Sequence, residues 1–259
     1  MIDTHTHIDG EEFNEDREQV ILRAKEAGVE KLFIPAIDLK SVDTVLQTCR
    51  KFPNYAYPMI GLHPEEVRAD WQEQLAPMRK LLEQPNQPFI AIGEVGLDYY
   101  WSREFEHEQL LAFEEQVRWA IEFNLPLMIH CRKGQNEMVN LLRRYEKDLL
   151  RGGVFHCFTG NETEAQQLLS FPRFVLGIGG VLTFKKSHLP EVLPQVVPLN
   201  RIVLETDSPY MAPVPMRGKR NESAFVPYVL QKLAECYGVS EQEADNITTA
   251  TALRLFGME

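Results

Sequence analysis

The feature that most constrains the fold of this chain is a regular alternation of short apolar runs with longer amphipathic segments. Apolar runs of a few residues, rich in Val, Ile, Leu or Phe, suit strands buried on both faces of a parallel sheet. Eight such runs predict eight strands: Ile2–Thr6, Lys31–Ala36, Tyr57–Leu62, Phe89–Glu94, Leu127–His130, Val154–Cys157, Phe174–Ile178 and Ile202–Glu205.

The segments between these runs show helical periodicity. Apolar residues recur every three to five positions in Glu104–Phe123 and every three or four positions in Gly134–Leu149. We expect Asn161 to cap a helix over Glu162–Ser170, and Ser240 to open the C-terminal helix as part of a capping box.

Strict alternation of strand and helix gives βα units with right-handed crossovers, and eight units predict a TIM (β/α)₈ barrel. The length of 259 residues suits one such barrel, so we expect a single domain over residues 1–259. An open doubly wound sheet and an incomplete barrel with seven strands remain as alternatives.

Composition and charge exclude several classes of protein. The 27 Lys and Arg against 38 Asp and Glu give a net charge of −11, which argues against tight, sequence-independent wrapping of nucleic acid. No apolar run approaches the roughly 20 residues of a membrane span, and no secretory signal is evident.

The four cysteines lie far apart and indicate reduced thiols. We therefore expect a cytoplasmic protein without membrane contact, and a monomer, since no long hydrophobic face indicates an obligate oligomer.

Histidines and carboxylates gather at the C-terminal ends of the predicted strands. These ends open on one face of a parallel barrel, where active sites are built. Two of the histidines, at positions i and i+2 of the first strand, point the same way. The residues expected at this mouth are His5, His7, His63, Glu94, His130, His156, Glu205 and Asp207.

This convergence predicts a metal site. Nitrogen and oxygen donors without a thiolate cluster suit Zn, Mn, Co or Mg. The candidate ligands are His5, His7, Glu94, His130, His156 and Asp207. Six ligands exceed the three or four that one catalytic ion takes, which favours two ions sharing a bridging carboxylate. Such a pair ionises a water and stabilises a leaving oxygen, so the sequence predicts a hydrolase.

Other catalytic chemistries lack their motifs. The chain has no GxSxG, GxGxxG or GxxxxGK[ST] segment. Cys131 and Cys157 directly follow two of the histidines, so we expect their thiols to face away from the site and to pack in the core.

Six segments resemble the TatD family of metal-dependent deoxyribonucleases, in order and at family spacing from the first residues to about Ser223. They are Asp3–His7, Gly61–Pro64, Ile92–Tyr99, Ile129–Arg132, Val154–Phe158 and Leu204–Tyr210. The resemblance implies a TIM-barrel metallohydrolase that cleaves DNA phosphodiester bonds. It also implies magnesium-dependent nuclease activity, often as a 3′→5′ exonuclease on single strands.

Roles for individual residues follow from the same resemblance. It implies that the six candidate ligands bind two divalent cations, here Mg, Mn or Zn, and that Glu94 bridges them. Asp207 would also orient or deprotonate the attacking water, so Glu94 and Asp207 are the expected catalytic residues. His63 and Arg132 would contact substrate phosphate. An Arg at this strand end suits a phosphate oxygen, with a solvated surface Arg as the alternative.

Further substrate contacts are expected at the rim of the barrel. Asp98 and Tyr99 follow Glu94 and are expected to line the pocket, with helix capping as the alternative for Asp98. The aromatic run Tyr99–Trp101 suits stacking on an unpaired base or packing over the rim.

The segment Arg217–Asn221 is the one dense basic patch and resembles the family's substrate-side loop, in which Arg217 is a candidate substrate contact. In that loop a proline commonly follows the Asn-Glu pair, but Ser223 stands here, so the loop is expected to be less rigid. A local patch in a chain of net charge −11 predicts that DNA ends or short single strands are held weakly. An exposed basic loop without a ligand is the alternative.

Three other functions remain open. An amidohydrolase-like enzyme for a small amide, ester or lactone uses a similar order of ligands, but many bridge their ions with a lysine, for which no candidate lies beside His130. A PHP-like phosphatase also opens with HxH, but its further histidine-rich motifs are not evident. A metal-binding scaffold without chemistry would predict a damaged ligand position, and none of the six is missing.

Overall fold

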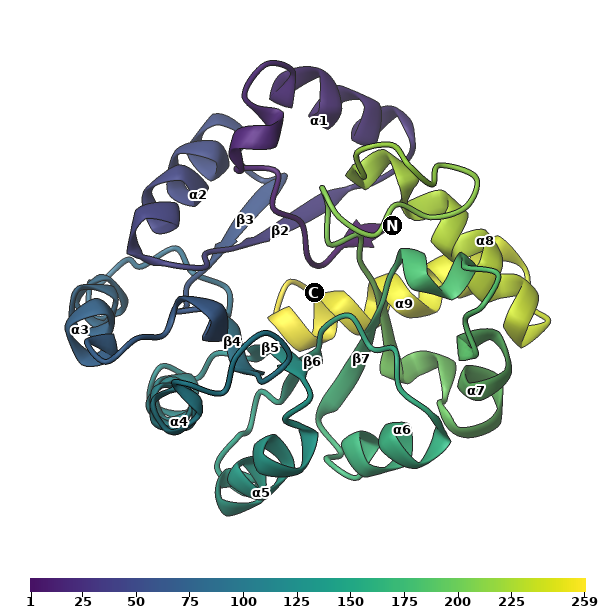
Figure 1. The fold of residues 1–259 in the computed structure, drawn as a ribbon. Helices are drawn as coiled ribbons and strands as arrows, with labels where there is room; N and C mark the ends of the chain where they lie inside the picture. Colours follow the sequence, from purple (N-terminus) through teal and green to yellow (C-terminus); the bar gives the residue numbers. More distant parts are fainter.

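The computed structural model describes residues 1–259, in which helices surround a ring of parallel strands (Figure 1). The strands are β1 (Ile2–Asp3), β2 (Lys31–Pro35), β3 (Ala56–Met59), β4 (Ile92–Asp98), β5 (Leu127–Arg132), β6 (Gly153–Phe155), β7 (Phe174–Ile178) and β8 (Ile202–Leu204). Each strand is followed by a helix that covers the outside of the ring, as a right-handed βα unit requires.

The sheet closes through two narrow seams. Strands β1 to β3 pair in sequence order, and so do β4 to β8. A bridge between Ile60 and Ile92 joins the two sets on one side, and a bridge between Thr6 and Ser208 joins them on the other. The TIM (β/α)₈ prediction is therefore confirmed, and the open sheet and the seven-stranded barrel are excluded.

Several strands differ from their predicted extents, and the differences in β1 and β4 affect the mouth. Strand β1 ends at Asp3 rather than Thr6, because Thr6 pairs with Ser208 only as a single bridge. Strand β4 begins at Ile92 and continues to Asp98, because it pairs with β5 up to Arg132. Glu94 therefore lies inside a strand rather than at its end.

The helices are α1 (Arg17–Glu26), α2 (Leu39–Lys51), α3 (Trp71–Leu82), α4 (Glu106–Glu122), α5 (Gln135–Tyr145), α6 (Glu162–Leu169), α7 (Leu189–Val196), α8 (Val226–Tyr237) and α9 (Glu241–Phe256). Both predicted N-cap residues are confirmed, but the capping box expected at Ser240 is not formed, because the Glu243 side chain makes no bond back to the Ser240 backbone. The Asn161 side chain accepts from the backbone N–H of Glu164, and Ser240 accepts from that of Glu243. Helix α5 ends before the predicted Leu149. No helix of the chain is both long enough and apolar enough for a membrane crossing.

The barrel interior has an apolar layer at the end opposite the mouth. Side chains from the strands meet residues of α9, including Ala252, Leu255 and Phe256, in a hydrophobic cluster. Helix α9 thus closes this end of the barrel. A second, larger cluster runs from Ile8 to Ala244 between the strands and the outer helices. We propose on this basis that residues 1–259 form one domain.

Candidate active site

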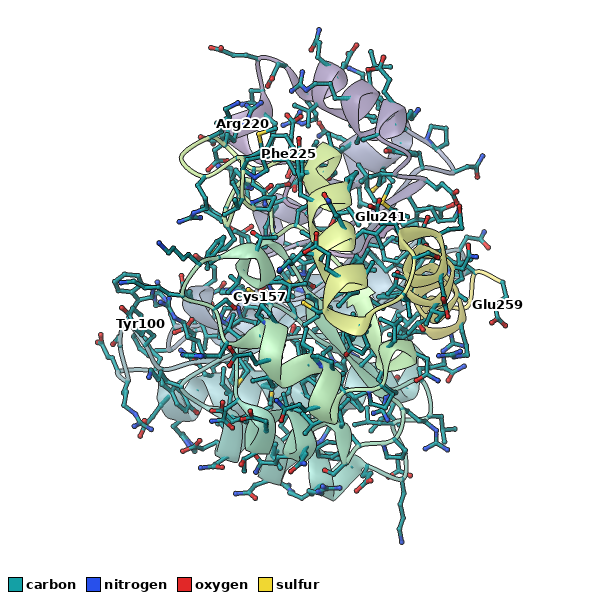
Figure 2. All side chains as sticks on the ribbon, turned by 90° about the vertical axis from the view of Figure 1, so that its right-hand side faces the viewer. Tyr100, Cys157, Arg220, Phe225, Glu241 and Glu259 are labelled. Atoms are coloured by element: carbon teal, nitrogen blue, oxygen red, sulfur yellow. The ribbon has the colours of Figure 1, made fainter.

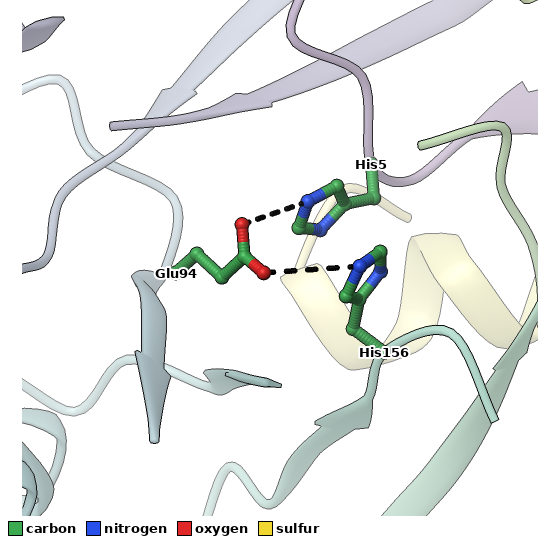
Figure 3. Close-up of side chains that lie close together, drawn as sticks. All are labelled: His5, Glu94 and His156. Carbon is green, nitrogen blue, oxygen red and sulfur yellow. Dashed lines mark ion pairs between the residues drawn. The ribbon is translucent and has the colours of Figure 1, made fainter. Parts of the chain in front are cut away.

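The structure brings together seven side chains that the sequence predicts at the mouth. They come from β4 and β5 and from the segments that follow β1, β3, β6 and β8, and the other six surround the buried carboxylate of Glu94. Figure 3 shows this carboxylate beside the stacked imidazoles of His5 and His156, with one oxygen directed at each ring. The seven residues are His5, His7, His63, Glu94, His130, His156 and Asp207.

The two oxygens of Glu94 face two different groups of imidazoles. Oε2 lies 3.1 Å from Nε2 of His5 and 3.5 Å from Nε2 of His7. Oε1 lies 3.0 Å from Nδ1 of His130 and 3.3 Å from Nε2 of His63. A single carboxylate is therefore shared between two donor groups, one on each side.

Asp207 completes the group on the Oε2 side. Its Oδ1 lies 3.6 Å from Nε2 of His7, 3.8 Å from Nε2 of His5 and 3.7 Å from Nε2 of His156. The backbone of Asp207 has a φ of 56°, and its N–H donates to the carbonyl of His5 at 2.9 Å. This bond joins the loop after β8 to the segment after β1 and keeps Asp207 beside the two histidines.

Asp3 ties the same two segments together below the site. Its Oδ1 accepts from the backbone N–H groups of Thr206 (3.0 Å) and His5 (3.3 Å), and its Oδ2 accepts from the Thr206 hydroxyl (2.6 Å). Burial raises the pKa of Asp3 to about 7, although these bonds counteract the rise. This buried network holds both ends of the seam between β1 and β8 in place.

Asp98 contacts a histidine rather than open solvent. Its Oδ2 lies 2.8 Å from Nε2 of His130, and its own backbone N–H and C=O are both bonded to the buried side chain of Gln109. A carboxylate in this position fixes the orientation of the imidazole and makes it a stronger ligand. The direct substrate contact expected for Asp98 stays a prediction.

Glu205 lies beside His156 in the way that Asp98 lies beside His130. Its buried Oε1 lies 3.0 Å from Nδ1 of His156 and accepts from the backbone N–H of Cys157 at 2.6 Å. The sequence places Glu205 at the mouth but assigns it no role. The available signal is its spacing, a buried carboxylate two residues before Asp207.

Gly177 on β7 makes room for Glu205. A Cβ at this position would lie 2.1 Å from Oε2 of Glu205. We expect Gly177→Ala to displace the carboxylate and loosen His156, lowering metal affinity about 10- to 100-fold. Crowding at this buried site is also expected to reduce the free energy of unfolding by about 1–3 kcal/mol. Metal titration by calorimetry and unfolding in urea measure the two effects.

Gly179→Ala is the matched control, because a Cβ there would lie 3.2 Å from the backbone oxygen of Glu205 and would not reach its carboxylate oxygens. Equal metal affinity in the two variants would contradict the positioning role of Glu205.

The other predicted contacts have defined surroundings. Tyr99 is buried in the large hydrophobic cluster, with the guanidinium of Arg103 4.8 Å from its ring centre. The guanidinium of Arg132 lies over the ring of Tyr100. Arg217 packs over Phe184 at 4.0 Å and donates to the carbonyl of Ala212. The substrate contacts expected for Tyr99, Arg132 and Arg217 stay predictions.

The expected orientation of Cys157 is wrong. Its sulfur lies within 4.8 Å of donor atoms of His156 and Asp207, so the thiol faces the site. Strand β6 ends at Phe155, and Cys157 adopts a left-handed φ of 49°, so the alternation of a strand no longer applies there. Burial raises the pKa of this thiol well above its usual range, as do the nearby carboxylates, so it is protonated and a poor nucleophile.

The site holds opposite charges in close contact. Burial raises the pKa of Glu94, but the imidazoles of His5, His63 and His130 outweigh burial and hold that pKa well below its usual range. Burial likewise raises the pKa of Asp207, and His156, His7 and His5 lower it below the usual range. Both carboxylates are therefore ionised at neutral pH.

This donor set fits divalent cations. Nε2 of His5 and Nε2 of His7 face each other at 3.2 Å, an approach that suits two nitrogen lone pairs around a shared proton or cation. Imidazole and carboxylate donors form three groups, and within each group the donor atoms lie within 4.8 Å of one another. The groups are His5, His7 and Asp207; His5, Glu94 and His156; and His63, Glu94 and His130. Hard oxygen and imidazole ligands of this kind suit Mg, Mn or Zn.

Metal binding is expected to release protons. Burial lowers the pKa of His130 and of His156, but their carboxylate partners raise these values to about 10 and about 9. Burial also lowers the pKa of His7, but its hydrogen bonds to Asp207 and Glu94 raise it well above the usual value. These three imidazoles are therefore positively charged at neutral pH in the metal-free protein, whereas a ligand must be neutral. Binding should release roughly three protons, so apparent affinity should rise by up to about 1,000-fold per pH unit just above pH 7.

Calorimetric titration of metal into metal-free protein, in two buffers of different ionisation enthalpy at equal pH, counts these protons. A binding enthalpy that does not depend on the buffer would contradict the prediction.

TIM barrels carry their active sites at this end of the strands, and such a group of buried imidazoles and carboxylates defines a metal-dependent hydrolase. Comparison with known proteins bears out this class. A family model described as TatD related DNase matches residues 2–257, and the chain belongs to this family.

The relatives match over their full lengths. An uncharacterized metal-dependent hydrolase, YabD of Bacillus subtilis, is 35% identical over 99% of this chain and 98% of its own length. A 3′-5′ ssDNA/RNA exonuclease TatD of Erwinia tasmaniensis is 33% identical over the whole of both chains. The crystal structure of YJJV, a TatD homolog from Escherichia coli, superposes with a TM-score of 0.90 at 28% identity, covering 100% of this chain and 98% of that one.

Proposed function

We propose that this chain is an exonuclease that cleaves DNA phosphodiester bonds from the 3′ end with two divalent cations. The observation that carries the proposal is the division of Glu94 between two donor groups, with Oε2 facing His5 and His7 and Oε1 facing His63 and His130. A shared carboxylate between two sets of donors suits a pair of ions, and paired ions are typical of enzymes that cleave phosphodiesters.

Two sets of residues would hold the cations. His5, His7 and Asp207 would hold one together with Oε2 of Glu94, and His130 and His156 would hold the other together with Oε1. When bound, the cations would polarise a phosphate oxygen and acidify a water molecule. His63 lies 3.3 Å from Oε1 of Glu94, close enough to serve as a ligand. The role we propose for His63 is contact with the substrate phosphate.

Asp207 is the proposed general base. Its side chain is partly exposed to the mouth, and the surrounding histidines keep it ionised, so Oδ1 can accept a proton from the attacking water. Three imidazole Nε2 atoms lie 3.6–3.8 Å from Oδ1, and these charge contacts keep the Asp207 carboxylate in position. Arg132 and Arg217 are the proposed cationic contacts for the rest of the substrate.

Single-stranded DNA is the proposed substrate, on two grounds. The Erwinia relative is named as an exonuclease of single-stranded DNA and RNA. With a net charge of −11, the protein has positively charged side chains in excess only in local patches. This distribution suits weak, short-range binding of a strand end by a monomer. The imidazole and carboxylate donors of the site support Mg, Mn or Zn as cofactor.

The test is hydrolysis of a 5′-end-labelled single strand by metal-free protein resupplied with Mg, Mn or Zn. The proposal predicts a ladder that shortens from the 3′ end and is lost in Glu94→Gln. Two bound metal ions per chain without cleavage under any ion would contradict it and would favour a small-molecule hydrolase on the same barrel.

A further inference from the structure

Two exposed aromatic side chains stand at the rim of the mouth, in the loop after β4. Trp101 is 72% exposed, more than any other large apolar side chain of the protein, and Tyr100 is 48% exposed. Their rings meet edge to face with centroids 4.8 Å apart. Figure 2 shows Tyr100 at the edge of the molecule, on the side opposite the C-terminal Glu259. Packing over the rim would bury these rings, so their exposure needs another explanation.

Arg132 adds a cation to this aromatic pair. Its guanidinium lies 3.5 Å from the ring centre of Tyr100 and 5.5 Å from that of Trp101. The planar guanidinium stacks on aromatic faces and stays charged at every physiological pH. The three side chains form one small surface of π faces and positive charge, which we name the rim platform (Tyr100, Trp101 and Arg132).

The rim platform is joined to the active site by short, partly buried hydrogen bonds. The backbone N–H of Tyr100 donates to Oδ1 of Asp98 at 2.9 Å, while Oδ2 of the same carboxylate contacts His130. Arg132 lies two residues beyond His130 on β5, and its carbonyl accepts from the backbone N–H of Tyr99. The platform therefore stands at a set position relative to the candidate metal ligands.

We infer that the rim platform stacks an unpaired nucleobase of the strand whose terminal phosphodiester occupies the active site. This inference rests on the proposed function and names the structural basis for single-strand preference. Every base offers a π face, so stacking tolerates any sequence, and the arginine adds attraction to the strand. A base inside a duplex is already stacked and paired, so the platform discriminates against double strands.

The first test measures binding without hydrolysis. Fluorescence anisotropy of a labelled single-stranded oligonucleotide is titrated with metal-free protein, as wild type and as Tyr100→Leu/Trp101→Leu. We expect the double variant to bind about tenfold more weakly, within the range that one base stacked on aromatic rings contributes. Trp101→Phe should recover most of the loss, because it keeps a π face. Leu150→Ala, an exposed apolar residue in the loop before β6, is the matched control.

The second test locates the base. Oligonucleotides carrying one abasic residue at each of the last positions of the 3′ end are compared in both proteins. At one position the abasic residue should weaken wild-type binding about tenfold, the loss expected for the double variant on an intact strand. The double variant should bind this abasic oligonucleotide as tightly as it binds the intact strand. An equal loss in the variant at every position would overturn the proposal, as would equal affinity of wild type and variant for the intact strand.

The two proposals fail in distinguishable ways. If the protein digests DNA and kcat/KM for the single strand is the same in the double variant, the nuclease proposal stands and the rim platform is wrong. If no ion supports cleavage but base-dependent binding to the platform persists, the nuclease proposal is wrong and the platform stands.

Discussion

Glu94→Gln is expected to remove metal binding and to lower hydrolysis by at least about 10³-fold, because one neutral amide then replaces the carboxylate shared by two donor groups. The amide keeps the shape of the side chain but presents only one oxygen, which cannot serve both the His5 side and the His130 side. The loss of negative charge also removes the main attraction for cations inside the barrel. Metal content after gel filtration and initial rates on a labelled single strand measure the two effects.

The matched control for this variant is Glu65→Gln. Glu65 is an exposed carboxylate in the short helix Pro64–Glu66 directly after His63, so its replacement changes the net charge equally but leaves the cluster intact. An unchanged circular dichroism spectrum would show that Glu94→Gln still folds. Retention of two metal ions and near wild-type rates by Glu94→Gln would refute the bridging role.

Asp207→Asn is expected to preserve the fold and to lower kcat by about 10²- to 10⁴-fold, the usual contribution of a general base. The amide cannot accept a proton from water at neutral pH, whereas the wild-type carboxylate is kept ionised by His156, His7 and His5. Because these histidines hold its pKa below the usual range, wild-type activity should lose this base only as the pH falls through that lowered value. The acidic limb assigned to Asp207 should therefore be absent from the rate profile of the variant.

Rates measured at saturating metal from pH 9 down to below the usual aspartate pKa of about 4 check this assignment. Asp148→Asn, which replaces an exposed carboxylate after α5, is the control for the change in charge. A variant at Asp207 with wild-type kcat would show that another group accepts the proton.

The fold could be predicted because each of its elements depends on local sequence. Buried strands need runs such as Phe174–Ile178, and helices need a periodic apolar face and a cap such as Asn161. Parallel strands joined by helices all end on one side, so the polar residues after them had to meet. The same logic predicts that His5, His7 and Asp207 meet at one mouth, and their contacts confirm it.

Two of the contacts that organise the site could not be predicted in this way. Asp98 reaches His130 because β4 continues past its predicted end and pairs with β5 as far as Arg132. Cys157 turns toward the site because its backbone leaves the strand conformation. Both depend on where a strand ends, and pairing with neighbouring strands decides that.

The barrel, the end at which its site forms and the donors that meet there follow from periodicity and spacing along the chain. The division of Glu94 between two donor groups, the contact of Glu205 with His156 in the space left by Gly177, and the exposure of Tyr100 and Trp101 beside Arg132 depend on the folded arrangement. The physical reason is that periodicity along a chain specifies which face a residue occupies. Distances between side chains on different strands are set only when the barrel closes and its registers are fixed.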